Sequence, residues 1–229
     1  MIQILIRSAI SIVLVVGLII LGVRYLQEPV IRPTVEIEAS QDTLTNVVPV
    51  YAQFVATQKL ILDSAGPVTY IELPVYEAEL GQHFTVMLRG AETVGEWDLM
   101  TTAAGEVVPA RLTLTPARVL TGDFELQIDG DSISHDDKDL APQLFIQTAD
   151  DYYPDGNYRI ADNEKQGDIA MVLYEEVSNL QEYQEDWRNR PLNAVKLGLL
   201  VALTLLLAAS VAWLRLTPLS RQENGSSAG

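Results

Sequence analysis

The chain has 229 residues, of which 31 are Asp or Glu, 15 are Lys or Arg and none is Cys. The lack of cysteine excludes disulfide frameworks, thiolate zinc sites, iron–sulfur clusters and cysteine nucleophiles. The formal net charge of −16 argues against nucleic acid as a partner, because binding it depends on Lys and Arg that neutralise phosphates.

The chain begins with a long apolar segment. Ser8 to Val23 is a run of 16 residues without a charge, between Arg7 and Arg24. Together with its apolar neighbours, such a helix would cross a hydrocarbon core of about 30 Å. We therefore predict a transmembrane helix, acting as a signal anchor, over residues 1–26. A cleaved signal peptide is the alternative, although no pair of small residues typical of a cleavage site follows the run.

An acidic β-sandwich is expected over residues 27–174. The hydrophobic pattern there has period two, which is typical of half-buried strands, and the turns between the strands are rich in Gly, Pro, Asp and Asn. The chain offers no room for the crossover helices that a parallel sheet requires. These features predict an all-β, antiparallel sandwich of jelly-roll or immunoglobulin-like kind. The expected strands lie in residues 35–39, 53–62, 68–73, 83–88, 111–115, 123–128, 144–148 and 168–174.

One expected loop of this domain concentrates carboxylates. Clustered hard oxygen ligands suit Ca²⁺, which accepts six to eight of them in flexible geometry. The EF-hand spacing is not met, because Ile133 occupies the fifth position of the loop. We expect either a solvated acidic loop with no cofactor or a Ca²⁺ site, whose ligands would be Asp129, Asp131, Asp136, Asp137 and Asp139.

Aromatic residues beside carboxylates form a second candidate site. Aromatic rings can stack on sugar rings while carboxylates accept hydrogen bonds from the hydroxyls. Packing in the core or in turns is the alternative for such residues in a sandwich. The candidate ligand-binding residues are Trp97, which stands between Glu96 and Asp98, and the group Tyr152, Tyr153 and Tyr158.

The late part of the domain resembles known β-sandwich modules. Three stretches carry the resemblance: residues 142–146 (PQLFI), 153–158 (YPDGNY) and 167–173 (GDIAMVL). They form a pattern of strand, turn and strand that is similar to the late strands of jelly-roll carbohydrate-binding modules. The resemblance covers about residues 142–174 only. It implies a glycan as a partner and permits a structural Ca²⁺, but no binding residue can be transferred position by position.

The C-terminal region is expected to be helical. Residues 175–192 change to a helical period, with Val177, Leu180, Tyr183 and Trp187 on one face, and predict an amphipathic stalk next to the membrane. Leu197 to Leu214 is a run of 18 residues without a charge, which predicts a second transmembrane helix over residues 193–216. A disordered tail is expected over residues 217–229.

Small residues recur in the second apolar run. They would allow close helix approach and contact with a partner protein in the membrane. Neither apolar run contains a charged residue, which argues against transport of ions or protons through this chain. The candidate contact residues are Gly198, Ala202, Ala208 and Ala212.

Two spans place both termini on one side of the bilayer and the sandwich on the other. Residues 27–192 hold 10 Lys and Arg against 30 Asp and Glu. The count of Lys and Arg beside the spans favours a cytoplasmic domain, but loops longer than about 60 residues are translocated largely regardless of charge. We therefore expect a two-pass protein of the cell membrane, with cytoplasmic termini and residues 27–192 extracytoplasmic.

No catalytic motif is recognisable. The chain has two His, no HExxH, no G-x-S-x-G, no phosphate-binding loop and no dinucleotide fingerprint. The expected function is that of a membrane-anchored interaction module, an accessory or scaffolding subunit of a membrane or cell-envelope assembly. The alternatives are a carbohydrate-binding module of the cell surface, with or without Ca²⁺, and an enzyme that acts on envelope polymers through paired carboxylates.

Overall fold

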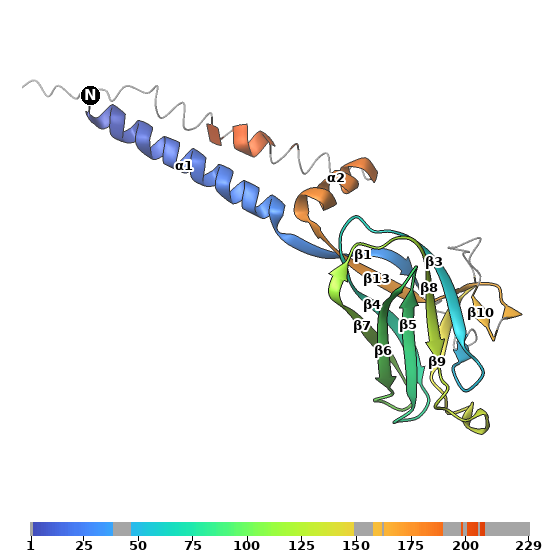
Figure 1. Ribbon diagram of the computed structural model, residues 1–229. Coiled ribbons are helices and arrows are strands. Elements are labelled where there is room, and N and C mark those ends of the chain that lie inside the picture. The colour runs from blue at the N-terminus through green and yellow to red at the C-terminus, as the bar shows by residue number, and fades with distance from the viewer. Residues whose placement is uncertain are drawn as a thin grey trace, which may run out of the picture. The chain divides into compact units, whose positions relative to one another are not determined.

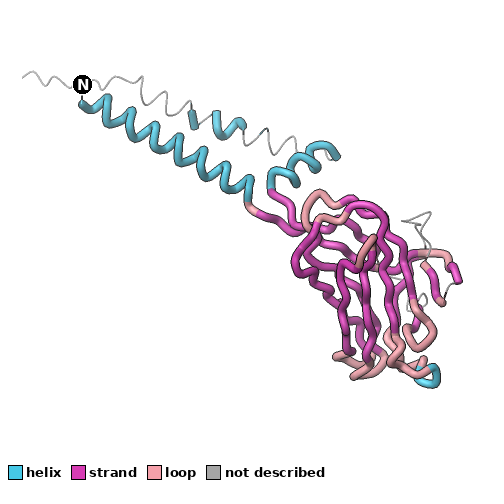
Figure 2. The backbone as a smooth tube through the Cα atoms, in the orientation of Figure 1, coloured by secondary structure: helices cyan, strands magenta, loops and turns pink. Residues whose placement is uncertain are grey.

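The computed structural model describes residues 2–38, 47–148, 158–161, 163–189, 198, 201–205 and 207–208. The chain divides into two compact units. One unit contains helices α1 (Ile2–Gln27) and α2 (Asn179–Asn189). The other unit, residues 30–177, contains the β-sheets (Figure 1 and Figure 2).

The first sheet is antiparallel in every pair of strands whose register is described. Its strand order is β1-β13-β4-β9-β12, with β2 on β9 and β7 on β4. The first and last long strands of the unit, β1 and β13, are therefore neighbours. The bounds are β1 Pro29–Ile37, β2 Val47–Pro49, β4 Val68–Glu77, β7 Glu106–Arg118, β9 Gln143–Gln147, β12 Asp168–Ile169 and β13 Met171–Ser178.

The second sheet is also antiparallel, with strand order β11-β10-β3-β8-β5-β6. Strand β6 lies at one edge of it. The bounds are β3 Ala56–Asp63, β5 His83–Arg89, β6 Thr93–Met100, β8 Thr121–Asp129, β10 Arg159–Ile160 and β11 Asn163–Glu164, and a short 3-10 helix, η1, covers His135–Asp137.

The two sheets form a sandwich-like fold, as the alternating pattern predicts. Alternate residues of each central strand point inward and are buried, and they form one continuous apolar core. Both sheets contribute large, fully buried side chains to this core. Fully buried examples are Ile71, Leu73, Leu112 and Leu173 from the first sheet and Leu60, Leu88, Leu126 and Ile128 from the second.

The helical unit is held together where α1 ends and α2 begins. Asn179 donates its side-chain N–H to the carbonyl of Tyr25 at 2.8 Å and its backbone N–H to the carbonyl of Glu28 at 3.1 Å. The hydroxyls of Tyr25 and Tyr183 lie 3.1 Å apart. The bond to Tyr25 gives a partner to a carbonyl in the last turn of α1, where carbonyls lack intrahelical donors.

The predicted transmembrane helices over residues 1–26 and 193–216 are wrong: no helix within the described residues is long and apolar enough to cross a membrane. Helix α1 has 26 residues, but its charge-free run, Ser8 to Val23, has 16. That run spans about 24 Å, less than a hydrocarbon core of about 30 Å. In the second predicted span only residues 198, 201–205 and 207–208 are described, and the rest of residues 193–216 lies outside the described part of the chain.

The two-pass localisation depended on these two spans. Cytoplasmic termini with residues 27–192 outside the membrane require both crossings, and the same finding contradicts that topology. The predicted helical stalk is also corrected at its start. Strand β13 continues to Ser178, so that Val177 is a buried strand residue, and the helix begins only at Asn179.

Candidate functional site

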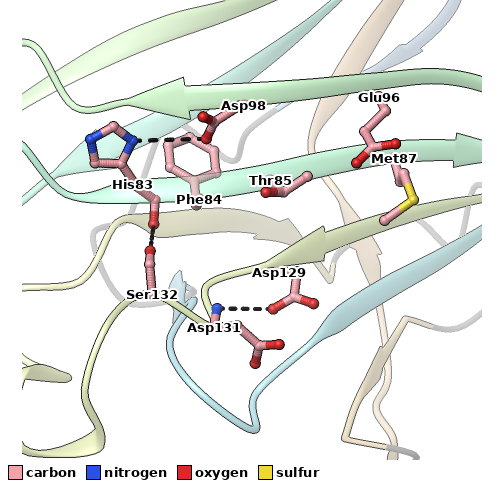
Figure 3. A pocket seen from close by; sticks show the side chains of 9 residues that line it. All are labelled: His83, Phe84, Thr85, Met87, Glu96, Asp98, Asp129, Asp131 and Ser132. Atoms are coloured by element: carbon pink, nitrogen blue, oxygen red, sulfur yellow. Dashed lines mark hydrogen bonds and ion pairs between the residues drawn. The ribbon is translucent and has the colours of Figure 1, made fainter.

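A pocket of about 470 Å³ opens on the outward face of the second sheet. Strands β5, β6 and β8 provide most of its wall, and the residues that follow β8 complete it (Figure 3). We call it the acidic pocket. It is lined by His83, Phe84, Thr85, Met87, Glu96, Asp98, Asp129, Asp131 and Ser132.

Strand register brings the acidic side chains of this pocket together. Thr85, at the centre, is paired with Asp98 of β6 on one side and with Asp129 of β8 on the other. Met87, two residues along β5, is paired with Glu96. Residues paired across strands share a face of the sheet, and the inward face is taken by the core residues that alternate with these. The acids are therefore turned outward.

Two hydrogen bonds shape the end of the pocket formed after β8. The Ser132 hydroxyl donates to the backbone carbonyl of His83 at 2.5 Å, and the backbone N–H of Asp131 donates to Oδ1 of Asp129 at 2.9 Å (Figure 3). The first bond ties the loop after β8 to the start of β5. The second holds the Asp129 carboxylate against the backbone of Asp131.

The pocket is strongly anionic. Four carboxylates line it, and among its nine lining residues the only base is His83, whose Nδ1 lies 3.8 Å from Oδ1 of Asp98. Burial raises the pKa of Asp129 above its ordinary value of 3.8, and the charge of Asp131 raises it further, while the bond from the Asp131 N–H opposes this shift. The negative charges of the pocket are thus not neutralised by bases within it.

The predicted calcium ligands are only partly brought together. Asp129 and Asp131 line the acidic pocket, whereas Asp136 and Asp137 lie in η1 and Asp139 follows it, all three exposed. Over the described ranges, no group of three or more His, Asp or Glu side chains is placed to hold a metal ion. Calcium binding by these five residues stays a prediction.

The predicted aromatic residues have separate places in the fold. Trp97 lies on the inward side of β6, packs against the core and donates its indole N–H to the carbonyl of Thr113 in β7 at 2.9 Å. Tyr158 is buried, 8% exposed, and burial raises its pKa. Tyr152 and Tyr153 lie outside the described residues. Carbohydrate binding at this set stays a prediction, and packing accounts for the placement of Trp97 and Tyr158.

The predicted helix-contact residues are described only in part. Gly198, Ala202 and Ala208 lie in short described helical pieces, and Ala212 is outside the described residues. A side chain built on Gly198 would meet no atom within 4 Å. Contact between helices through these residues stays a prediction.

Sequence reasoning did not single out Thr85, Met87 or Ser132, and it treated Glu96 and Asp98 only as neighbours of Trp97. A signal for these two acids was present. In the triplet Glu96-Trp97-Asp98, alternation on a strand turns both acids to one face when the tryptophan faces the core.

Comparison with known proteins adds no relative from which a function could be transferred. No protein-family model matches the chain, and a search of curated proteins finds no match either. The function is therefore argued from the geometry of this chain.

Proposed function

We propose that this protein is an interaction module, an accessory or scaffolding subunit, whose β-sandwich binds a basic segment of a partner protein at the acidic pocket. The observation that carries the proposal is the gathering of Glu96, Asp98, Asp129 and Asp131 around one hollow of about 470 Å³. The surplus of acids in residues 27–192 adds a long-range attraction for basic partners.

The spacing of the acids favours an extended peptide over a single cation. Asp98 and Glu96 are alternate residues of one strand, about 7 Å apart, and Asp129 lies two strands away from Asp98, about 10 Å. A metal ion draws its oxygen ligands to about 2.5 Å from one centre. Alternate side chains of an extended peptide repeat at about 7 Å, which matches the distance along β6.

The pocket also offers an apolar surface between the acids. Met87 lies on β5 between Glu96 of β6 and Gln127 of β8 and is partly exposed. Lys and Arg bury their aliphatic stems against such a surface while the charged end reaches a carboxylate. A peptide with Lys or Arg at alternate positions therefore fits both the charges and the floor of the pocket.

The test is a titration of the full chain with a fluorescent peptide of alternating Lys and Ser. A mild non-ionic detergent keeps the chain dispersed, because α1 exposes large apolar side chains such as Leu21, 64% exposed. The double variant Asp98→Asn/Asp129→Asn is expected to bind about tenfold more weakly, since it removes two partly exposed ion pairs. Fluorescence polarisation measures the change.

The matched control is Asp63→Asn/Asp123→Asn. It removes the same charge from exposed positions of β3 and β8 that do not line the pocket, and binding is expected to stay within about twofold of the original chain. An equal loss in both double variants, or equal binding of a peptide with Gln in place of Lys, would reject the proposal.

A further inference from the structure

Three planar side chains form a stack on the outward face of the first sheet. The guanidinium carbon of Arg111 lies 3.6 Å from the centre of the Tyr70 ring. The rings of Tyr70 and Tyr174 are stacked, with centres 4.4 Å apart and an angle of 23° between their planes. Arg111 thus begins a row that crosses from β7 through β4 to β13.

Strand pairing creates this row. Tyr174 is directly opposite Tyr70 in the register of β13 and β4, and Arg111 is paired with Glu72, two residues from Tyr70 on β4. Direct and diagonal neighbours on one face of a sheet are within reach of aromatic and long side chains. All three residues are partly or fully exposed, so the row belongs to the surface and not to the core.

The row ends at Tyr174 with negative charge around it. Strand β1 is the next strand beyond β13, and it carries Glu36, which is exposed. Burial raises the pKa of the Tyr174 hydroxyl, and the charge of Glu72, a hydrogen bond with Glu72, Tyr70 and the charge of Glu36 raise it further. Within the described part of the chain no cation forms an ion pair with Glu36.

We propose that the face of Tyr174 opposite Tyr70, together with Glu36, binds an arginine side chain of a partner protein. The chain itself holds an arginine on the other end of the same stack, in the contact of Arg111 with Tyr70. A planar guanidinium is weakly hydrated, stacks on aromatic rings and pairs with a carboxylate, so arginine suits this place better than lysine.

This arginine site is separate from the acidic pocket. The stack lies on the first sheet and the pocket on the second, so that they occupy the two outward faces of the sandwich. The arginine site does not depend on the pocket, and one proposal can fail while the other stands.

The probe is N-acetyl-arginine amide, added to the full chain with isotope-labelled tyrosine rings and followed by NMR. We expect saturable shifts of the Tyr174 ring signals. Tyr174→Leu should weaken binding about three- to fivefold and Glu36→Gln about twofold, as expected of an exposed cation–π contact and an exposed ion pair. For Tyr174→Leu, the signals of Tyr70 report the binding.

Three controls separate this site from general charge attraction. Tyr174→Phe keeps the ring and should bind within about twofold. Glu106→Gln removes one exposed charge at the far end of β7 and should have no effect on binding. N-acetyl-citrulline amide has a neutral planar group of the same shape, and it should bind at least about threefold more weakly.

The proposal is overturned if the tyrosine signals do not move up to the solubility limit of the probe, if citrulline binds as well as arginine, or if Glu106→Gln weakens binding as much as Glu36→Gln. A loss on Tyr174→Phe equal to that on Tyr174→Leu would also reject it, because the hydroxyl and not the ring face would then make the contact.

Discussion

The carboxylate of Asp129, which lines the acidic pocket, makes the stability of the fold depend on pH. Its carboxylate is partly buried beside Asp131, and both effects raise its pKa above the ordinary value of 3.8. The folded state therefore holds the proton of this group more tightly than the unfolded state does. This contribution to stability is fully present below the ordinary pKa and is lost as the pH rises through the raised one.

Asp129→Asn should for this reason increase stability at neutral pH. Asn removes the charge but keeps the Oδ1 that accepts the Asp131 N–H bond. We expect a higher midpoint of thermal unfolding at pH 7, with a difference from the original chain that shrinks as the pH falls toward 4. Differential scanning calorimetry at several pH values measures it. A lower midpoint at pH 7 would contradict the role assigned to this carboxylate.

At the scale of the strand, β6 depends on one close approach between neighbours. The Trp97 ring lies so near Gly95 that a Cβ added there would fall 2.4 Å from Cη2 of the indole. Trp97 in turn bonds the carbonyl of Thr113 in β7. The glycine therefore lets the tryptophan join the edge strand of the second sheet to a strand of the first.

Gly95→Ala should displace the Trp97 ring and lower the free energy of unfolding by about 1–3 kcal/mol, the usual cost of overpacking. Chemical denaturation followed by circular dichroism measures the loss. The variant Gly105→Ala tests backbone strain instead of crowding, because Gly105 has a φ of +76° and no atom lies within 4 Å of its Cβ position. In a chain that already carries Trp97→Leu, Gly95→Ala should lower the free energy of unfolding by less than about 1 kcal/mol. An unchanged loss would show that the backbone at Gly95, and not the Trp97 ring, causes the destabilisation.

Alternation was enough to predict several of the strands but not all of them. The expected strand 83–88 lies within β5, and 123–128 lies within β8. Strand β6 was not predicted, because its glycine and acids read as a turn. Strand β1 begins at Pro29, before the predicted 35–39, and it contains Pro29 and Pro33 because proline is tolerated in an edge strand.

The acidic pocket could not be predicted from local patterns. Asp98 and Asp129 are brought to either side of Thr85 by pairing between strands that are distant in the sequence. Composition located the acids around the end of β8, but only the pairing of β8 with β5 and of β5 with β6 places Asp129 in one pocket with Asp98. The first apolar run was misjudged for a different reason: its apolar neighbours were counted toward the width of the bilayer, although Arg7 and Arg24 bound the charge-free run.

At the scale of the whole sandwich, an ion pair with a buried carboxylate joins the first long strand to the last. Arg32 of β1 donates Nε and Nη2 to Oε1 of Glu175 in β13 at 2.9 and 2.7 Å. The other oxygen of Glu175, Oε2, accepts the backbone N–H of Gly66 at 3.1 Å, and this carboxylate is only 1% exposed. One buried group thus serves two strands and a turn.

Glu175→Ala should destabilise the sandwich by about 3 kcal/mol, because it removes a buried carboxylate that accepts hydrogen bonds from the Arg32 guanidinium and from the backbone N–H of Gly66. Chemical denaturation followed by circular dichroism measures the loss. The neighbouring Glu176, which is exposed, provides the control, and Glu176→Ala should change stability by less than about 0.5 kcal/mol. Similar losses of stability in both variants would show that the ion pair contributes no more to stability than an exposed glutamate does.

The hydrogen bond between Glu28 and Asn179 implies that the segment between them begins and ends at nearly the same place. The backbone N–H of Asn179 and the carbonyl of Glu28 are 3.1 Å apart. Domains whose ends lie close together tolerate insertion into a host loop and circular permutation. The β-domain could therefore be inserted into a surface loop of an unrelated carrier protein with short linkers. It could also be circularly permuted, with its present ends joined and new ends opened at the turn around Gly105.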